Sequence, residues 1–445
     1  MPARLDAALA SPALRGAQVG ALVVSARDGR QIYAHDPDRP LIPASNQKIL
    51  TALAALSAFG PAYRFTTDVR ADRPPDRSGA VGTLYVIGGG DPGLTAERWW
   101  RLAADLRARG IARVDRLVLD DGRFDREWWH PSWGAVSSRV YHAPVASLGA
   151  SYGAFTAWVA PGAMPGDPVA VRIDPPVDSF QIENKARTGP PRRGYRFQLE
   201  RASSPAGERV VVSGLLPAGA RPVPVLRSVS DPVRFAGAVL RAQLEAVGID
   251  VRGETGVGTT PASAVPIYEF AGSSVAEAVV PFLKWSVNVV GETLCKDLAV
   301  LRGAPRGSFA AGAAAIRAEL ARLGIPLTET VIVDGSGLSY WNRTTPRTLV
   351  AALRIARDRF GLGPELEAGL PILGSDGTLR RRGTGAPGLV RAKTGLLTRM
   401  VALSGYAIGP DGEVRVFSVI VNGHRGDARS AMRALDAFAE ALTRP

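Results

Sequence analysis

The feature that most constrains the fold is a change of character along the chain. Between about Tyr63 and Pro266, short apolar runs typical of β-strands are separated by turns rich in glycine and proline. The residues before and after this stretch carry apolar side chains at helical spacing, together with a few longer strands. We therefore expect a discontinuous domain of residues 1–62 and 267–445, interrupted by an inserted β-rich region, residues 63–266, of two subdomains.

The two outer segments predict an antiparallel sheet covered by helices, an α/β (α+β) fold. Residues 18–25 and 31–34 flank an Asp-Gly pair, which is a β-hairpin signature. A proline turn then leads into a helix near Ser45 that Gly60-Pro61 ends. Further helices are expected over residues 3–15, 273–282 and 308–323 and from about 288, and further strands over 330–333, 388–395, 400–408 and 414–421. A closing helix follows, so the N- and C-terminal strands are expected to lie side by side.

The inserted region has its own expected elements. They are strands near residues 83–87, 116–119, 169–172 and 209–212 and helices near 97–109 and 232–247. Arg187-Thr-Gly189 resembles a catalytic triplet, but it lies in a loop rich in proline and arginine, and we interpret it as coincidence. Gly88–Pro92 lacks the lysine of a phosphate-binding loop, which indicates a structural turn.

The charge of the chain argues against one class of partner and draws attention to its lysines. The net charge is +13, but the basic residues are scattered and form no stripe interleaved with aromatic side chains, so no nucleic-acid partner is expected. Only five of the 54 basic residues are lysine. Because arginine cannot lose its proton in a protein, a lysine retained in such a chain indicates a need for a titratable amine.

Several other classes of site and segment are not expected. The single Cys295 rules out an internal disulfide, and no Cys/His spacing suits zinc, so we expect no metal and no cofactor. No apolar run approaches 18 residues, and the N-terminus lacks the plan of a signal peptide. The sequence therefore predicts no transmembrane segment.

Three short motifs carry the chemistry. Ser45 and Lys48 lie three residues apart at the start of a helix, which places the amine within reach of the hydroxyl. A lysine whose pKa is lowered by burial or by nearby positive charge can remove the proton of a serine nucleophile. Ser286-Val-Asn288 and Lys393-Thr-Gly395 follow in the order typical of serine β-lactamases and penicillin-binding proteins. Taken alone, Ser286 and Asn288 also suit a helix cap and Lys393 a solvated turn, but the ordered set favours an active site.

With these motifs, the sequence resembles the class C low-molecular-mass penicillin-binding proteins, which are D-alanyl-D-alanine carboxypeptidases and endopeptidases of bacterial walls. The resemblance covers nearly the whole chain. Besides the three motifs it rests on residues 87–92, 143–148, 334–339 and 376–379. It also implies a penicillin-binding transpeptidase/β-lactamase-like domain interrupted by inserted domains, which agrees with the long gap between the first two motifs. Residues 334–339 and 376–378 are expected to be turns that frame the cleft.

The resemblance implies a role for each motif. Ser45 would attack the carbonyl of the penultimate D-alanine while Lys48 takes its proton. Ser286, with Asn288, would relay that proton to the leaving amine and hold the substrate amide. Lys393 would attract the terminal carboxylate and lower the pKa of Lys48.

The strand that carries the third motif is expected to bind substrate through its next residues. Thr394 would donate a hydrogen bond to the terminal carboxylate, beside Gly395. The backbone N–H groups of Leu396 and Ser45 would form the oxyanion hole.

The sequence thus predicts a serine D-Ala-D-Ala carboxypeptidase that also cleaves peptidoglycan crosslinks. Its expected partners are stem peptides ending in D-Ala-D-Ala and β-lactams that acylate it, and its expected location is the periplasm or the cell wall. Two alternatives stay open: a β-lactamase or esterase on the same scaffold, and a wall-binding protein with a vestigial site.

Overall fold

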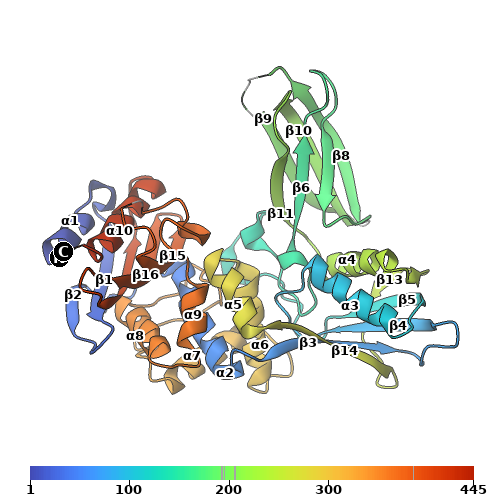
Figure 1. Cartoon of the computed structure of the whole chain (residues 1–445), viewed down its shortest axis with the longest axis horizontal. Coiled ribbons are helices and arrows are strands. Elements are labelled where there is room, and N and C mark those ends of the chain that lie inside the picture. The colour runs from blue at the N-terminus through green and yellow to red at the C-terminus, as the bar shows by residue number, and fades with distance from the viewer. Residues whose placement is uncertain (192–193, 195, 205–206, 384, 445) are drawn as a thin grey trace. The chain divides into compact units, whose positions relative to one another are not determined.

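The chain forms two compact units, seen in the computed structural model, which describes residues 1–191, 194, 196–204, 207–383 and 385–444 (Figure 1). Unit 1 comprises Met1–Tyr63, His130–Gly134 and Ser274–Pro445. Unit 2 comprises Arg64–Trp129 and Ala135–Ser273. Most of the inserted sequence therefore forms its own unit, while five residues from its middle belong to unit 1.

Unit 1 is built on a five-stranded antiparallel sheet with the order β15-β16-β17-β1-β2. Its strands are β1 (Gln18–Ser25), β2 (Gln31–His35), β15 (Val390–Leu397), β16 (Met400–Ile408) and β17 (Val414–Asn422). The expected hairpin is present, and β1 pairs with β17 from Gln18 opposite Asn422 to Ser25 opposite Arg415. The N- and C-terminal strands are thus neighbours, and both are buried at nearly every residue, so the sheet is covered on both faces here.

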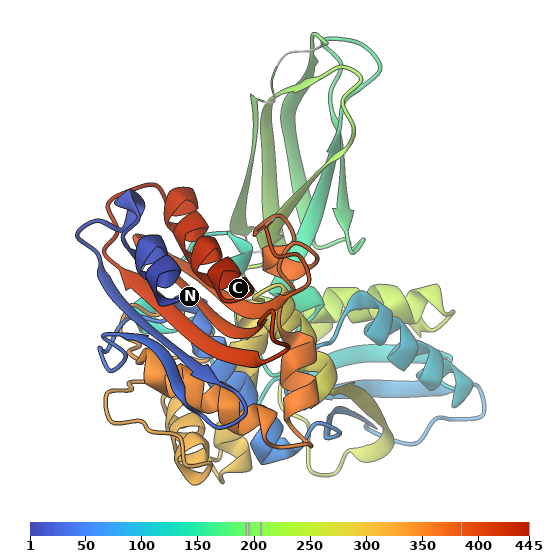
Figure 2. The same ribbon diagram turned by 60° about the vertical axis from the view of Figure 1, so that its left-hand side comes forward.

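Helices cover the two faces of this sheet. On one face α1 (Pro2–Leu9) and α10 (Ala428–Ala441) lie side by side and share a core with the strands (Figure 2). Against the same sheet pack α8 (Pro346–Arg357) and the turn that precedes α2 (Gln47–Phe59). Around α2 lie α5 (Val275–Lys284), α6 (Asn288–Leu301), α7 (Phe309–Arg322) and α9 (Gly363–Gly369). Helix α2 is therefore almost wholly buried, from Gln47 through Leu56.

Unit 2 contains a sheet with the order β12-β5-β4-β3-β14, in which β13 also pairs with β5. Its strands are β3 (Arg64–Ala71), β4 (Ala80–Gly88), β5 (Arg113–Asp120), β12 (Asp250–Val251), β13 (Thr255–Val257) and β14 (Val265–Ser274). Helices α3 (Ala96–Ala108) and α4 (Pro232–Ala246) pack on it around the buried Trp99. Because β14 lies beside β3, the unit extends to Ser273, whereas the expected inserted region ends at residue 266.

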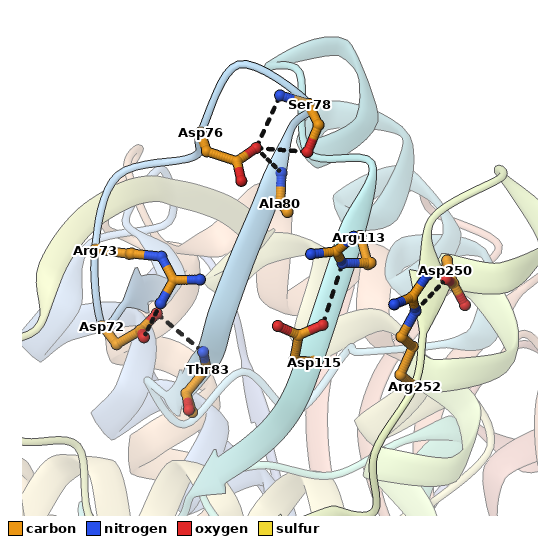
Figure 3. A network of polar contacts seen from close by, with 10 residues as sticks. All are labelled: Asp72, Arg73, Asp76, Ser78, Ala80, Thr83, Arg113, Asp115, Asp250 and Arg252. Carbon is orange, nitrogen blue, oxygen red and sulfur yellow. Dashed lines mark hydrogen bonds and ion pairs between the residues drawn. The ribbon is translucent and has the colours of Figure 1, made fainter.

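A cluster of polar side chains lies at one end of this sheet (Figure 3). The Ser78 hydroxyl and the backbone N–H groups of Ala80 and Ser78 donate hydrogen bonds to Asp76, and these bonds lower the pKa of Asp76 to about 2. The ion pairs beside it are at least partly exposed, as Arg113 with Asp115 and Arg252 with Asp250 show. Exposed pairs contribute little stability, so the cluster mainly closes the turn between β3 and β4.

Two further three-stranded sheets complete unit 2. Their orders are β11-β6-β7 and β8-β10-β9. Their strands are β6 (Ala154–Ala160), β7 (Ala170–Asp174), β8 (Phe180–Gly189), β9 (Arg196–Ser204), β10 (Gly207–Pro217) and β11 (Val223–Ser228). Alternating burial along β6 and β10 gives each one apolar face, and these faces share the core of the unit.

Three local expectations are wrong. The helix expected over 3–15 stops at Leu9, because Pro12 lacks the N–H that a continued helix needs, and a short 3₁₀ turn follows. Residues 330–333 form only an isolated bridge between Val331 and Arg343. Arg187-Thr-Gly189 ends strand β8 instead of lying in a loop.

Among the described residues, no helix combines the length and apolar character that crossing a membrane requires.

Candidate active site

Ser45 lies on a 3₁₀ turn, Ala44–Asn46, that leads directly into α2. The chain before it is fixed by Asn422 at the end of β17, which accepts from the N–H of Ile42 at 2.8 Å and donates to its carbonyl at 3.0 Å. After Ser45, the Asn46 amide donates to the Ser404 hydroxyl at 2.7 Å. Ala44 has a φ of 48°, a region that non-glycine residues seldom adopt. The sheet therefore holds the half-buried Ser45 hydroxyl in a defined place.

Lys48 follows on the first turn of α2 and is completely buried. Its Nζ lies 3.1 Å from Ser45 Oγ, 2.7 Å from Asn288 Oδ1 and 2.6 Å from the carbonyl oxygen of Ser336. These oxygens come from the turn before α2, from α6 and from the loop of residues 334–339. The amine is therefore fixed from three parts of unit 1.

Burial sets the protonation of this amine. Loss of hydration lowers the pKa of Lys48 to about 7, although the negative charges of Glu292 and Asp334 act in the opposite direction. Lys393 was expected to lower the pKa of Lys48. The effect found runs the other way: burial, together with repulsion by Lys48, lowers the pKa of Lys393. Lys48 thus loses its proton near neutral pH.

Ser286 and Asn288 occupy the connection between α5 and α6. Ser286 is half-buried with a φ of 61°, so its backbone is held in a conformation that costs a serine free energy. The N-cap of α6 is Val287 and shows no side-chain cap, which excludes the alternative that these residues serve as helix caps. Asn288 instead points its Oδ1 at Lys48.

The third motif lies on β15, beside the nucleophile. A Cβ added to Gly395 would lie 2.8 Å from the carbonyl oxygen of Pro43, so only glycine lets the strand approach the turn of Ser45 this closely. Lys393 is completely buried, and its Nζ donates to the carbonyl of Thr394 at 2.9 Å. Leu396 is half exposed. The strand therefore borders the site as expected, with the residues after Lys393 next to Ser45.

Three polar contacts at the site were not indicated by any sequence motif. Glu292 is completely buried and accepts at 2.8 Å from the backbone N–H groups of both Gly335 and Ser336. Burial and the charge of Asp334 raise the pKa of Glu292 to about 8. The second contact is a hydrogen bond between the hydroxyls of Thr378 and Thr394, which lie 2.8 Å apart. The third is an ion pair between Lys284 and Asp376. Only a helical spacing of four residues from Asn288 could have indicated Glu292.

The site thus brings together a hydroxyl, a buried amine that titrates near neutrality and a second buried lysine. Hydrogen bonds join Ser45, Lys48 and Asn288 directly, and Gly395 touches the turn of Ser45, whereas Ser286 and Leu396 lie on the adjoining loop and strand. In the part of the chain that the structure describes, no group of three or more His, Cys, Asp or Glu side chains is placed to hold a metal ion. The arrangement suits acyl transfer to serine.

Known proteins share this sequence and this fold. The model of the D-Ala-D-Ala carboxypeptidase 3 (S13) family matches residues 1–442. A D-alanyl-D-alanine carboxypeptidase of Actinomadura sp. (strain R39) is 36% identical over 98% of this chain and 83% of its own length. The D-alanyl-D-alanine carboxypeptidase DacB of Haemophilus influenzae is 26% identical over 93% of this chain and 88% of its own. These matches span both units.

Solved structures agree with the sequence relatives. Penicillin binding protein 4 (dacB) of Haemophilus influenzae superposes with a TM-score of 0.82 and 25% identity over 98% of each chain. The Bd3459 predatory endopeptidase of Bdellovibrio bacteriovorus, in complex with its immunity protein, has the same fold, with a TM-score of 0.57 and 15% identity over 96% of this chain and 94% of its own. The expected fold class and resemblance are confirmed. This chain belongs to the D-Ala-D-Ala carboxypeptidase 3 (S13) family and is a serine-type peptidase.

Proposed function

We propose that this carboxypeptidase works through an acyl-enzyme on Ser45, with Lys48 as the base. The observation that carries the proposal is the set of oxygens around the Lys48 amine. A neutral amine has two N–H groups and one lone pair. Because Asn288 Oδ1 and the Ser336 carbonyl can only accept hydrogen bonds, they take the two N–H groups and leave the lone pair for the Ser45 hydroxyl.

The reaction then proceeds in two stages. Ser45 Oγ attacks the carbonyl carbon of the penultimate D-alanine while its proton moves to Lys48. The peptide C–N bond breaks, and the departing amine takes a proton relayed through Ser286. Water next hydrolyses the ester and frees both Ser45 and the shortened peptide. The N–H groups of Ser45 and Leu396 are proposed as the oxyanion hole, in which removing one donor typically costs about 3 kcal/mol.

The terminal carboxylate of the substrate is proposed to bind beside β15. Burial lowers the pKa of Lys393, but an arriving carboxylate favours the charged amine, so substrate and proton would bind Lys393 together. The Thr394 hydroxyl, oriented by Thr378, would donate a second hydrogen bond to the carboxylate. Gly395 would leave room for the substrate backbone between strand and nucleophile.

The pKa of Lys48 leads to a prediction for pH dependence. Below pH 7 the neutral amine becomes scarce, so the second-order rate constant for acylation by benzylpenicillin is expected to fall about tenfold for each pH unit. Above about pH 8 the rate should level off, because nearly all of the Lys48 amine is then neutral. Stopped-flow measurements from pH 5 to 9 check this, and a rate constant that is flat between pH 5 and 7 would contradict a lysine base.

The activity itself is tested with two substrates. A peptide ending in D-Ala-D-Ala is expected to release free D-alanine, and a crosslinked peptide dimer from peptidoglycan is expected to give two monomers, both detected by mass spectrometry. Cleavage of the first substrate alone would remove the endopeptidase part of the proposal. Rapid hydrolysis of benzylpenicillin with no D-alanine release would favour the β-lactamase alternative. No reaction with either peptide or with benzylpenicillin would favour a wall-binding protein with a vestigial site.

We further propose that unit 1, which contains most of the expected residues 1–62 and 267–445, is the catalytic domain and that it acts on stem peptides in the periplasm or cell wall. The support is the family match, together with a structure of Haemophilus influenzae penicillin binding protein 4 in complex with a β-lactam. A β-lactam carries a carboxylate and a strained amide that imitate the end of such a peptide. Penicillins are accordingly proposed as covalent inhibitors of this chain.

A further inference from the structure

A five-residue segment from the middle of the inserted sequence belongs to unit 1. It is His130–Gly134, and the chain on either side of it belongs to unit 2. Trp133 is 9% exposed, and its ring and that of His130 both pack edge-on against Phe309, with centroids 5.8 and 5.1 Å away. Two hydrogen bonds tie the segment to the loop of residues 334–339: Trp133 Nε1 donates to Asp334 Oδ2 at 2.9 Å and Ser132 Oγ to Ser339 Oγ at 2.7 Å.

Asp334 is the centre to which this loop is fastened. Its carboxylate is completely buried and accepts four hydrogen bonds between 2.7 and 2.9 Å. The N–H of Gly337 and the amide of Asn342 bind Oδ1, whereas the N–H of Ser339 and the indole of Trp133 bind Oδ2. A buried carboxylate needs such donors, and losing one leaves its charge less well compensated. Of these donors, the Trp133 indole alone comes from outside residues 334–342.

This loop, held by Asp334, offers a hydrogen-bond acceptor to Lys48, the proposed base. The carbonyl of Ser336 accepts from Lys48 Nζ at 2.6 Å. The loop packs closely against the turn of Ser45 and helix α2: a Cβ at Gly337 would collide with the carbonyl oxygen of Ala44, and the Thr51 hydroxyl donates to the carbonyl of Gly335 at 2.8 Å. Where this loop sits therefore decides which way the two N–H groups and the lone pair of a neutral Lys48 point.

We propose that Trp133 is a positioning residue for acylation: by donating to Asp334 it holds the Ser336 carbonyl in place and so keeps the lone pair of Lys48 directed at Ser45. This inference rests on the proposed function of Ser45 and Lys48. It assigns to the inserted sequence a part in activating the nucleophile, exerted through one indole N–H and the loop of residues 334–339. Among the described residues, the titratable groups that interact electrostatically with Lys48 include Glu292, Asp334 and Lys393, and the tryptophan adds no charge to them.

The test is the Trp133→Phe variant, which keeps an aromatic ring against Phe309 and removes the N–H. Acylation by benzylpenicillin separates into a dissociation constant for the first complex and a maximal rate constant at saturating drug. The maximal rate constant is expected to fall about tenfold to a hundredfold, since small misplacements of a catalytic group cost this much. The dissociation constant is expected to change less than about twofold, because the drug's binding contacts remain.

A matched control exists in unit 2. The indole of Trp129 donates to the carbonyl of His142 at 2.8 Å, so Trp129→Phe removes an equivalent bond with no link to Asp334. This variant is expected to acylate at the wild-type rate. If Trp133→Phe is too unstable to assay, Ser132→Ala removes the other bond to the loop, and its maximal rate constant is expected to fall about threefold for a lost bond of ordinary strength.

The outcomes separate this inference from the proposed function. If the wild type forms an adduct on Ser45 and Trp133→Phe forms it at an equal maximal rate, the positioning role is refuted and the proposed nucleophile stands. A change confined to the dissociation constant refutes it as well, because that result assigns Trp133 to ligand binding. If the wild type forms no adduct on Ser45, the proposed function itself fails.

Discussion

The Ser45→Ala variant is expected to form no covalent adduct with benzylpenicillin, whereas the wild type gains the mass of one drug molecule. The hydroxyl is the atom that forms the ester, so its removal should lower the acylation rate by at least about 10⁴-fold, as for other serine nucleophiles. The fold should persist, because the Lys48 amine, which contacts this half-buried hydroxyl, keeps Asn288 and Ser336 as partners. Intact-protein mass spectrometry, followed by peptide mapping of the adduct, measures the result.

A second serine on the same helix provides the control. Ser57 lies near the end of α2, where its hydroxyl accepts from Arg322 at 2.9 Å. Ser57→Ala is expected to be labelled as fully as the wild type, with the adduct mapped to the peptide that contains Ser45. Labelling of Ser45→Ala at the wild-type rate would place the nucleophile elsewhere and overturn the proposed mechanism.

The sequence predicted the elements of the site because its short motifs carry both chemistry and local structure. A serine and a lysine three residues apart at the start of a buried helix are neighbours on one face, and the structure brings their side chains to 3.1 Å. The scarcity of lysine was also informative: Lys48, Lys393 and Lys296 are completely buried. Lys284 and Lys185 each form an ion pair, and of these two only Lys185 has a largely exposed side chain. Composition therefore pointed to lysines whose amines are mostly buried or held in ion pairs.

What the sequence did not predict depends on contacts between distant residues. The turn at 334–339 was expected to frame the cleft, yet its backbone carbonyl binds Lys48, and a backbone atom leaves no residue type to recognise. Trp133 lies 201 positions from Asp334, so no local pattern joins them. Helix α8 was not predicted either, although its amphipathic pattern is regular.

The division of the chain illustrates the same limit. Turn-rich β character between residues 63 and 266 indicated an inserted region because composition changes over long stretches. The strand β14 continues this unit to residue 273, since its pairing with β3 is a long-range contact. The return of residues 130–134 to unit 1 leaves no compositional trace at all. Boundaries set by long-range pairing thus have no local pattern from which to predict them.

The second large effect is expected from replacing the two buried lysines of the site by arginine. Lys48→Arg keeps a positive charge but supplies no group that can lose a proton near neutral pH, so acylation by benzylpenicillin should fall by about 10³-fold or more. Lys393→Arg makes the same replacement at an equally buried position. Because Lys393 is proposed to contribute charge for the carboxylate, which arginine also provides, this variant should lose less than about 10²-fold.

Comparing the two variants separates chemistry from packing. Both substitutions force a larger head group into a site with no exposed surface, so thermal denaturation is expected to show a similar loss of stability in the two variants. Stopped-flow acylation of the folded fraction then reports the chemical difference alone. Equal losses of rate would mean that Lys48 acts through its charge, and the proton would have to leave Ser45 by another route. A large loss in Lys48→Arg only would identify the amine whose pKa of about 7 matches the task of a base at neutral pH.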